Sequence, residues 1–144
     1  MTDTDLQAGL EVRAGGLTPE GYQALVTAVG WEPRSTADAR NLIINARHCV
    51  SAWANGELVG MGRVTGVGVS YAHLTDIAVV PELHGQGIGT SILEHLLRLV
   101  DRSMSPAATV TLNAVPGAEA FYRRFGFVAS ETPGLMTRSR GGEA

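Results

Sequence analysis

The sequence predicts an α/β layer fold, because strand-like segments come first as an antiparallel group and then alternate with helices. The antiparallel group is indicated by Asn55-Gly56, a pair typical of a two-residue hairpin. Two helix-like segments then separate the later strands. The predicted strands are residues 10–13, 48–53, 58–64, 71–80, 109–112 and a segment that opens at 127–128. The 144 residues suit a single domain over 1–144, in which 1–8 and 139–144 are expected to be flexible.

Two helices are predicted between the first and second strands. Thr18 is a suitable N-cap for the first helix, Pro19 fits its first position, and Gly30 can end it. Its apolar residues recur at helical spacing and are Tyr22, Leu25, Val26 and Val29. Ser35 can cap the second helix, whose apolar residues are Ala39, Leu42, Ile43 and Ala46.

The second half of the chain carries the longest predicted helix. Residues 87–102 have an apolar stripe broad enough to cover a sheet. The stripe consists of Ile88, Ile92, Leu93, Leu96, Leu97, Leu99 and Val100. Another helix is predicted over 116–125 and ends at Gly126. Gly66 and Gly68 predict a turn between the third and fourth strands.

Composition excludes several classes of function. The formal net charge of −3 does not suit a nucleic-acid partner. All 11 basic residues are Arg, so neither a lysine Schiff base nor a Walker lysine can form. Cys49 is the single cysteine, which rules out an internal disulfide and a multi-cysteine metal site, and no metal is expected. The chain has no apolar run of about 18 residues and no signal-like N-terminus, so we expect a cytoplasmic protein without a membrane partner.

A glycine-rich segment joins the fourth strand to the long helix. It consists of His84, Gly85, Gln86, Gly87, Ile88, Gly89 and Thr90. The first turn of a helix has unpaired N–H groups and the positive end of the helix dipole, and glycines let an anion approach them. We therefore expect a phosphate or pyrophosphate here, with His84 as an additional donor. The segment lacks the third glycine of a Rossmann fingerprint and the lysine of a Walker loop. The structural alternative is a tight turn that binds no ligand.

Two stretches resemble motifs of one family. Residues 74–97 resemble motif A of the GNAT superfamily of acyl-CoA N-acyltransferases, Arg/Gln-x-x-Gly-x-Gly/Ala at a helix start, with His84 in place of Arg or Gln. Residues 113–127 resemble motif B, and residues 121–127 match its Phe-Tyr-x-x-x-Gly-Phe pattern. The resemblance extends over about 9–138. Val29-Gly30-Trp31, Gly62-Arg63 and residues 75–79 further resemble a subgroup that includes plastid serotonin N-acetyltransferases of plants.

The resemblance implies a fold and a reaction. The fold is a mixed, mostly antiparallel sheet of six to seven strands with about four helices on its two faces. The reaction is transfer of an acetyl group from acetyl-CoA, a cosubstrate, to a primary amine that attacks the thioester directly. The fourth and fifth strands would separate, so that the main chain of Ile77, Ala78 and Val79 binds the pantetheine arm. The other implied binding positions are residues 84–90, Asn113 and Tyr122. The structural alternative for residues 77–79 is that they only form a buried central strand.

The resemblance also implies a catalytic acid at Tyr122. The acid protonates the departing thiolate, and a tyrosine with an ordinary pKa of about 10 is protonated at neutral pH. Packing in the core beside Phe121 and Phe125 is the structural alternative for Tyr122.

The base that takes the amine proton is less closely defined. Asp76 is the carboxylate candidate, and His73 and water are its rivals. Strand alternation predicts that Leu74, Asp76 and Ala78 share one face and that His73 lies on the other. A structural hydrogen-bond acceptor is the alternative role for Asp76.

The acceptor pocket is expected to come from the first part of the chain. Trp31, Pro33, Tyr71 and the loop at 66–70 could wall a pocket for an apolar amine, and the subgroup resemblance points to a small arylalkylamine. A homodimer is compatible with the resemblance. Two other functions fit the glycine loop: a catalytically silent acyl-CoA-binding sensor, and an interaction module that binds a phosphate or nucleotide.

Overall fold

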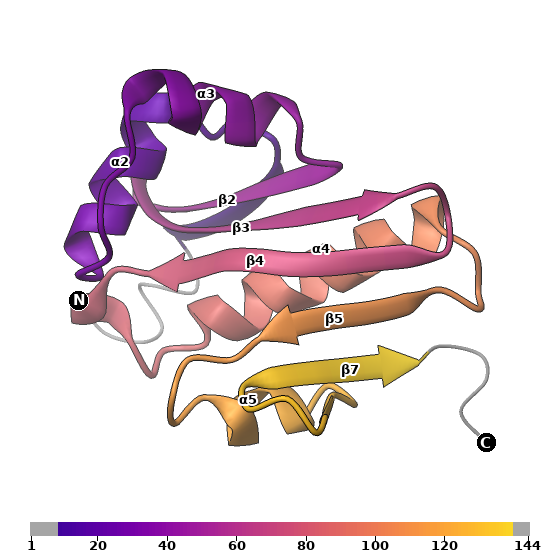
Figure 1. The fold of residues 1–144 in the computed structure, drawn as a ribbon. Coiled ribbons are helices and arrows are strands. Elements are labelled where there is room, and N and C mark those ends of the chain that lie inside the picture. The colour runs from indigo at the N-terminus through magenta and orange to yellow at the C-terminus, as the bar shows by residue number, and fades with distance from the viewer. Residues whose placement is uncertain (1–8, 140–144) are drawn as a thin grey trace.

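Seven strands form one sheet in the order β1-β2-β3-β4-β5-β7-β6. Figure 1 labels β2, β3, β4, β5 and β7 of this sheet. The bounds of the seven strands are β1 Leu10–Ala14, β2 His48–Ala54, β3 Glu57–Val67, β4 Tyr71–Val79, β5 Thr109–Asn113, β6 Val128–Ala129 and β7 Leu135–Ser139. Neighbouring strands are antiparallel except β4 and β5, which run parallel. The computed structural model describes residues 9–139, and the predicted flexibility of 1–8 and 140–144 concerns residues outside that range.

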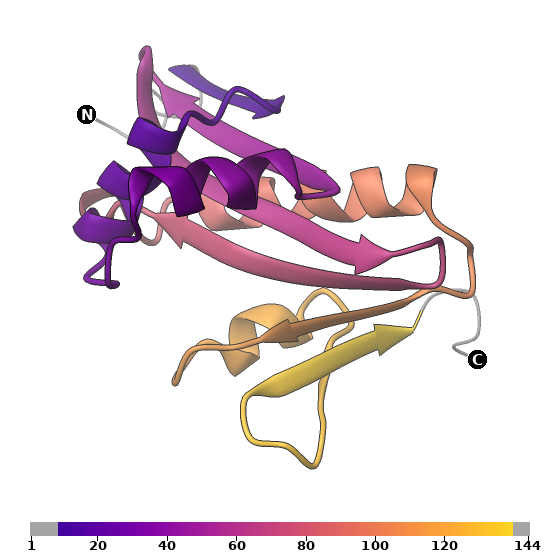
Figure 2. The same ribbon diagram turned by 45° about the horizontal axis from the view of Figure 1, so that its top comes forward.

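Helices cover both faces of this sheet (Figures 1 and 2). They are α2 Pro19–Ala28, α3 Thr36–Ile44, α4 Ile88–Ser103 and α5 Glu119–Arg123, and a short 3-10 turn, η1, spans Pro81–Leu83. Helices α2 and α3 lie on one face, and α4 crosses the other. Tyr122 of α5 belongs to the same buried cluster as the apolar side of α4. The predicted fold class, a mostly antiparallel sheet with helices on its two faces, is confirmed.

The local signals for the first helices and the hairpin are confirmed. Thr18 Oγ1 accepts a hydrogen bond from the amide of Gly21 at 3.0 Å, and Ser35 Oγ caps α3 in the same way. Asn55 and Gly56 both have positive φ, 52° and 84°, and connect β2 directly to β3. A two-residue turn of this kind matches the twist of its strands, so it fixes the register of the hairpin.

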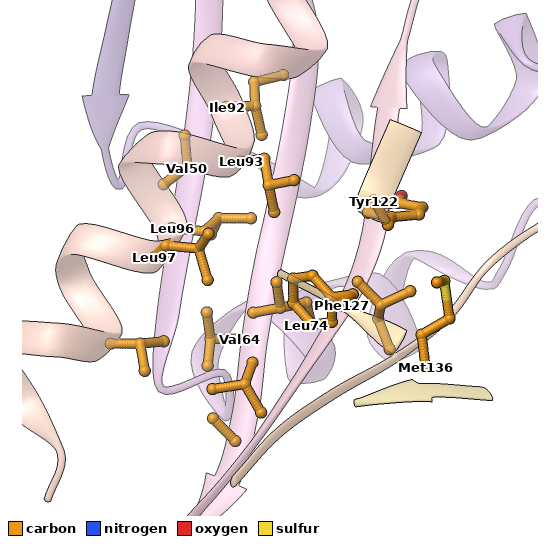
Figure 3. Packing of buried hydrophobic residues seen from close by; sticks show 14 of the residues in the cluster. Val50, Val64, Leu74, Ile92, Leu93, Leu96, Leu97, Tyr122, Phe127 and Met136 are labelled. Carbon is orange, nitrogen blue, oxygen red and sulfur yellow. The ribbon is translucent and has the colours of Figure 1, made fainter. Parts of the chain in front are cut away.

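The main core lies between α4 and the sheet, and Figure 3 shows its side chains. Ile92, Leu93 and Leu96 of α4 are fully buried there. Burying a side chain of this size stabilises a fold by about 1.5–3 kcal/mol. The predicted apolar stripe is therefore the surface that holds α4 on the sheet, with Leu99 half-buried at its edge. A smaller cluster under α2 and α3 surrounds Tyr22.

Three predicted boundaries are wrong. Helix α5 has five residues rather than the ten of 116–125, because Gly117 has φ +90°, which an α-helix cannot contain. Gly66 lies inside β3, and the turn follows at Gly68. Strand β7 was not predicted as an element, and its last residue, Ser139, falls in the predicted tail.

The alternation predicted for β4 is wrong beyond Thr75. Met61 pairs with Ala78 and Arg63 with Thr75, so two residues of β4, Asp76 and Ile77, stand opposite one residue of β3. This is a β-bulge, and the extra residue reverses the faces that follow it. Leu74 belongs to the cluster beneath α4, whereas Ala78 belongs to the cluster beneath α2 and α3. Asp76 therefore does not share a face with Leu74.

Candidate functional site

The glycine loop begins α4 with a left-handed backbone. Gly85 and Gly87 have φ of +82° and +86°, a conformation that side chains disfavour. A Cβ added at either glycine would meet no atom within 4 Å, so backbone conformation rather than crowding selects glycine. Gly87 is the N-cap of α4, and among residues 9–139 no side chain caps this helix start. The amides of the first turn are therefore available to an anion from outside the chain.

A pocket of about 620 Å³ lies against this loop, and we call it the glycine-loop pocket. It is lined by Ile77, Ala78, Val79, Leu83, His84, Gly85, Gly87, Ile88, Gly89, Thr90, Val115, Ala118, Phe121, Tyr122 and Arg124. The structure thus brings the predicted strand residues, most of the predicted loop residues and Tyr122 into one cavity. Gln86 and Asn113 were also predicted to bind the donor, but neither is among the described residues that line this pocket.

One wall of the pocket is an open strand edge. The pairing of β4 with β5 ends at Leu74 and Leu112, whereas β3 still pairs with β4 at Val79. Val80 donates its amide to Val59 O at 2.9 Å, so by antiparallel geometry the N–H and C=O of Val79 point away from β3. Because Val79 lines the pocket, these main-chain groups face a ligand placed there.

His84 makes its contact with this open edge. Its Nε2 lies 2.7 Å from Val79 O. A carbonyl oxygen can only accept, so Nε2 carries the proton and donates it. The imidazole is therefore engaged on β4, rather than directed at the loop amides where the sequence predicts a phosphate.

Tyr122 of α5 lines the glycine-loop pocket and also belongs to the main core cluster. The residue is 9% exposed, and its ring packs edge-on against Phe121 and Phe127, with centroids 5.1 and 6.2 Å away. Burial raises the pKa of the Tyr122 phenol, because a phenolate would lose its hydration. Tyr122 therefore packs in the core, which is the structural alternative given for it above. It is also a protonated group on the pocket wall.

A second pocket, of about 670 Å³, lies between the α2–α3 pair and β4, and we call it the Trp31 pocket. It is lined by Tyr22, Val26, Trp31, Glu32, Pro33, Arg34, Ser35, Asp38, Thr75, Asp76, Asn113 and Val115. Val115 lines both pockets, so the two are neighbours. The described lining contains Trp31 and Pro33 as predicted. It does not contain Tyr71, which begins β4 five residues, about 16 Å, before Asp76.

Asp76 lines the Trp31 pocket and is held by two neighbours. Its Oδ2 accepts a hydrogen bond from Arg63 Nε at 2.8 Å and another from the Tyr22 hydroxyl at 2.9 Å. The Arg63 and Asp76 side chains are 6% and 13% exposed. Arg34 Nε in turn donates to the Tyr22 oxygen at 3.3 Å. Burial raises the pKa of Tyr22, which keeps the phenol a donor to Asp76.

Two positions differ from what the sequence predicts. Asn113, predicted to bind the donor, is the last residue of β5 and lines the Trp31 pocket instead. Arg124, which was not predicted, brings a positive charge to the glycine-loop pocket, where its guanidinium carbon lies 5.8 Å from the ring centres of Phe121 and Phe125. Its place within the Phe-Tyr-x-x-x-Gly-Phe pattern could have drawn attention to it, since that segment supplies Tyr122.

Comparison with protein families places this geometry among acetyltransferases. Residues 19–139 match a family described as "Acetyltransferase (GNAT) domain". Curated relatives include a histone acetyltransferase of Glycine max, 32% identical over 74% of this chain and 50% of the relative. They also include a chloroplastic serotonin N-acetyltransferase of Oryza sativa, 28% identical over 87% of this chain and 65% of the relative. The chain spans about three fifths of the length of the first curated relatives it matches.

Solved structures show the same fold. A probable acetyltransferase of Staphylococcus aureus, of unknown function, superposes with a TM-score of 0.79 at 32% identity, covering 85% of this chain and 92% of the other. A GNAT acetyltransferase of Brucella melitensis, solved in complex with acetyl-CoA, superposes with a TM-score of 0.68 at 18% identity, covering 94% and 90%. Within residues 9–139, no helix has the length and apolar character needed to cross a membrane.

Proposed function

This chain belongs to the GNAT acetyltransferase family, and on that premise we propose that it transfers an acetyl group from acetyl-CoA to a primary amine. One observation carries the proposal: the open edge of β4, the left-handed glycine loop and Tyr122 line a single pocket. A long donor with a diphosphate at one end and a thioester at the other suits this order of groups. The acetyl-CoA bound to the Brucella melitensis protein belongs to that protein, and it indicates which donor to test here.

The loop and the strand edge would bind the donor through main-chain groups. The amides at the start of α4 face the pocket together with the positive end of the helix dipole, which favours the diphosphate. Arg124 adds a charge that complements it. The N–H and C=O of Val79 point into the pocket, where the amides of a pantetheine arm could pair with them as an added strand does. For this pairing His84 has to leave Val79 O.

Acetyl-CoA supplies the activated acyl carbon, and side chains of this protein would manage the protons. The amine nitrogen forms a bond to that carbon, and the bond from carbon to sulfur breaks. Tyr122 donates its phenolic proton to the departing sulfur, a role suited to a phenol whose raised pKa keeps it protonated. The proton of the attacking amine passes either to Asp76, which lines the Trp31 pocket, or to water there.

The acceptor would bind in the Trp31 pocket, which neighbours the glycine-loop pocket and shares Val115 with it. Trp31 and Pro33 provide apolar surface. Glu32 and Asp38 provide negative charge that Arg34, on the same lining, only partly offsets, a combination that suits an amine with an apolar body. A small arylalkylamine has this chemistry. The two plant relatives are named for different acceptors, a histone and serotonin, so the acceptor has to be found by experiment.

A thiol-release assay with a panel of amines tests this proposal. The panel contains tryptamines, polyamines, aminoglycosides and peptide N-termini, each with acetyl-CoA and each with a no-enzyme control. We expect release of CoA with at least one amine, together with the acetylated product by mass spectrometry. Acetyl-CoA binding without turnover on any amine would instead support the silent sensor. Binding of a simple nucleotide in place of acetyl-CoA would support the interaction module.

A further inference from the structure

Asp76 has a backbone conformation that few residues adopt. Its φ is +54°, and with Asn55 it is one of two non-glycine residues with positive φ that are recorded within residues 9–139. Asn55 lies in a hairpin turn, where positive φ is required, whereas Asp76 lies inside a strand. The left-handed region disfavours side chains, and Asp and Asn tolerate it best after glycine. A residue in this state inside a strand indicates a constraint from its surroundings.

The constraint coincides with the bulge of β4. Asp76 and Ile77 together oppose Gly62 of β3. A Cβ on Gly62 would lie 2.7 Å from Leu96 Cδ1 and 3.5 Å from Ile77 Cγ1, so the space that a side chain would need there is filled. The bulge thus turns Ile77 toward α4 and Ala78 toward α2, and the pairing with β5 ends just before it, at Leu74. The open strand edge of the glycine-loop pocket begins at this bulge.

The side chain of Asp76 holds the bulge against β3 and α2, and its partner Arg63 extends the network to α3. Arg63 of β3 donates to Oδ2, and Tyr22 of α2 donates to the same oxygen. Arg63 also donates through Nη1 to Leu42 O of α3 at 3.1 Å. Both side chains of the ion pair are nearly buried, so the pair cannot exchange freely with water.

We propose that Asp76 is a positioning residue: it holds the bulge in a left-handed conformation that aims the main-chain N–H and C=O of Val79 into the glycine-loop pocket. The amine proton then passes to water, and Asp76 takes no part in its transfer. This inference rests on the proposed function for its kinetic consequences, but its structural claim is independent of the ligand.

Three substitutions separate a positioning role from a catalytic one. Asp76→Asn keeps an oxygen that can accept from Arg63 and Tyr22, and Asn tolerates positive φ. Asp76→Gly loses the carboxylate and permits the conformation, whereas Asp76→Ala loses the carboxylate and disfavours it. Glycine and alanine leave Arg63 equally unpaired, so the difference between these two variants isolates the backbone.

For a positioning role, we expect Asp76→Asn to bind acetyl-CoA and turn over within about threefold of the wild type, with an unchanged pH profile. We expect Asp76→Ala to weaken acetyl-CoA binding by about tenfold relative to Asp76→Gly, a ratio that corresponds to about 1.4 kcal/mol. A loss of kcat by about a hundredfold or more in both the Asn and Gly variants, with acetyl-CoA binding intact, would mean that Asp76 is the base. That result overturns the inference and leaves the proposed function standing.

Thermal unfolding tests the structural claim without any ligand. At an ordinary strand position, a glycine variant is less stable to unfolding than an alanine variant. Here we expect Asp76→Gly to unfold about 2 to 8 °C above Asp76→Ala, because alanine carries the cost of the left-handed region. An alanine variant as stable as the glycine variant overturns the inference, even if the protein binds no acetyl-CoA. If the alanine variant does not fold while the glycine variant does, the order of stability is the expected one.

Discussion

At the scale of single residues, Tyr122 shows how burial and chemistry combine. The packing that buries its ring also raises the pKa of its hydroxyl, so the phenol stays protonated at the pH where an acid is needed. At Asp76 the structural role dominates instead: its carboxylate lines a pocket, but Arg63 and Tyr22 both already donate hydrogen bonds to its Oδ2. Having a titratable group in a pocket is therefore not enough to assign it a proton-transfer role.

Replacing Tyr122 with Phe removes the phenolic proton and keeps the ring. We expect turnover at saturating substrate to fall by about 10² or more, because general acid catalysis contributes on that scale, while the Kd for acetyl-CoA changes little. In the wild type, the raised pKa predicts no loss of rate from deprotonation of Tyr122 up to about pH 9. Steady-state kinetics and calorimetry measure the two effects. An unchanged rate in the Phe variant removes Tyr122 from the mechanism.

At the scale of elements, the site is made where β4 meets α4. The pairing of β4 with β5 ends just before the bulge, and the glycine loop then begins a helix whose first residues line the pocket. Two groups on this pocket are candidates to bind a phosphate: the main-chain amides of the glycine loop and the imidazole of His84. Substitutions at each can show which one contributes more to donor binding.

We expect Gly87→Val to weaken acetyl-CoA binding by tenfold or more and His84→Ala to change it by about threefold or less. Valine disfavours φ +86° and places its side chain where a phosphate would sit, whereas the loss of His84 leaves every loop amide in place. Gly15→Val is a matched control, because Gly15 has φ +83° and equally open surroundings but does not line the pocket. Calorimetric titration of all three gives the comparison. Equal losses for His84→Ala and Gly87→Val would identify the imidazole as a main phosphate ligand.

Much of this arrangement could be predicted from the sequence because it depends on local signals. Thr18 and Ser35 cap helices, Asn55-Gly56 forms a hairpin, and the stripe from Ile88 to Val100 buries one side of α4. The bulge at Asp76 could not be predicted, because it arises from contacts between elements that are distant in sequence, including Arg63 and Tyr22. Strand alternation assumes an unbroken ladder, so it placed Asp76 on the wrong face.

The C-terminal part was harder to predict for a related reason. Strand β7 has five residues, and its buried Met136 is held by pairing with β5 rather than by a local pattern. Asn113 was predicted to follow the strand 109–112, one residue short of its place as the last residue of β5, and which pocket it faces depends on the separation of β4 from β5. Which residues line a pocket depends on how several elements pack together, whereas sequence patterns predict only which residues each element contains.

At the scale of the whole molecule, two neighbouring pockets lie along consecutive parts of β4 and share Val115 in their linings. One combines a glycine loop with an open strand edge, and the other combines aromatic surface with carboxylates. A reaction that joins an anionic donor to an amine needs two such pockets in contact, with the reacting atoms at their junction. The central claim is that the donor lies along the β4 edge with its diphosphate on the amides of the α4 start.

A crystal structure of the protein with CoA tests that claim most directly. We predict the diphosphate within hydrogen-bond distance of the amides of residues 85–90, the pantetheine amides paired with the main chain of residues 77–79, and the sulfur beside the Tyr122 hydroxyl. CoA bound elsewhere would contradict the account, as would a glycine-loop pocket that stays empty at saturating CoA or a loop whose amides are occupied by the protein's own carboxylates.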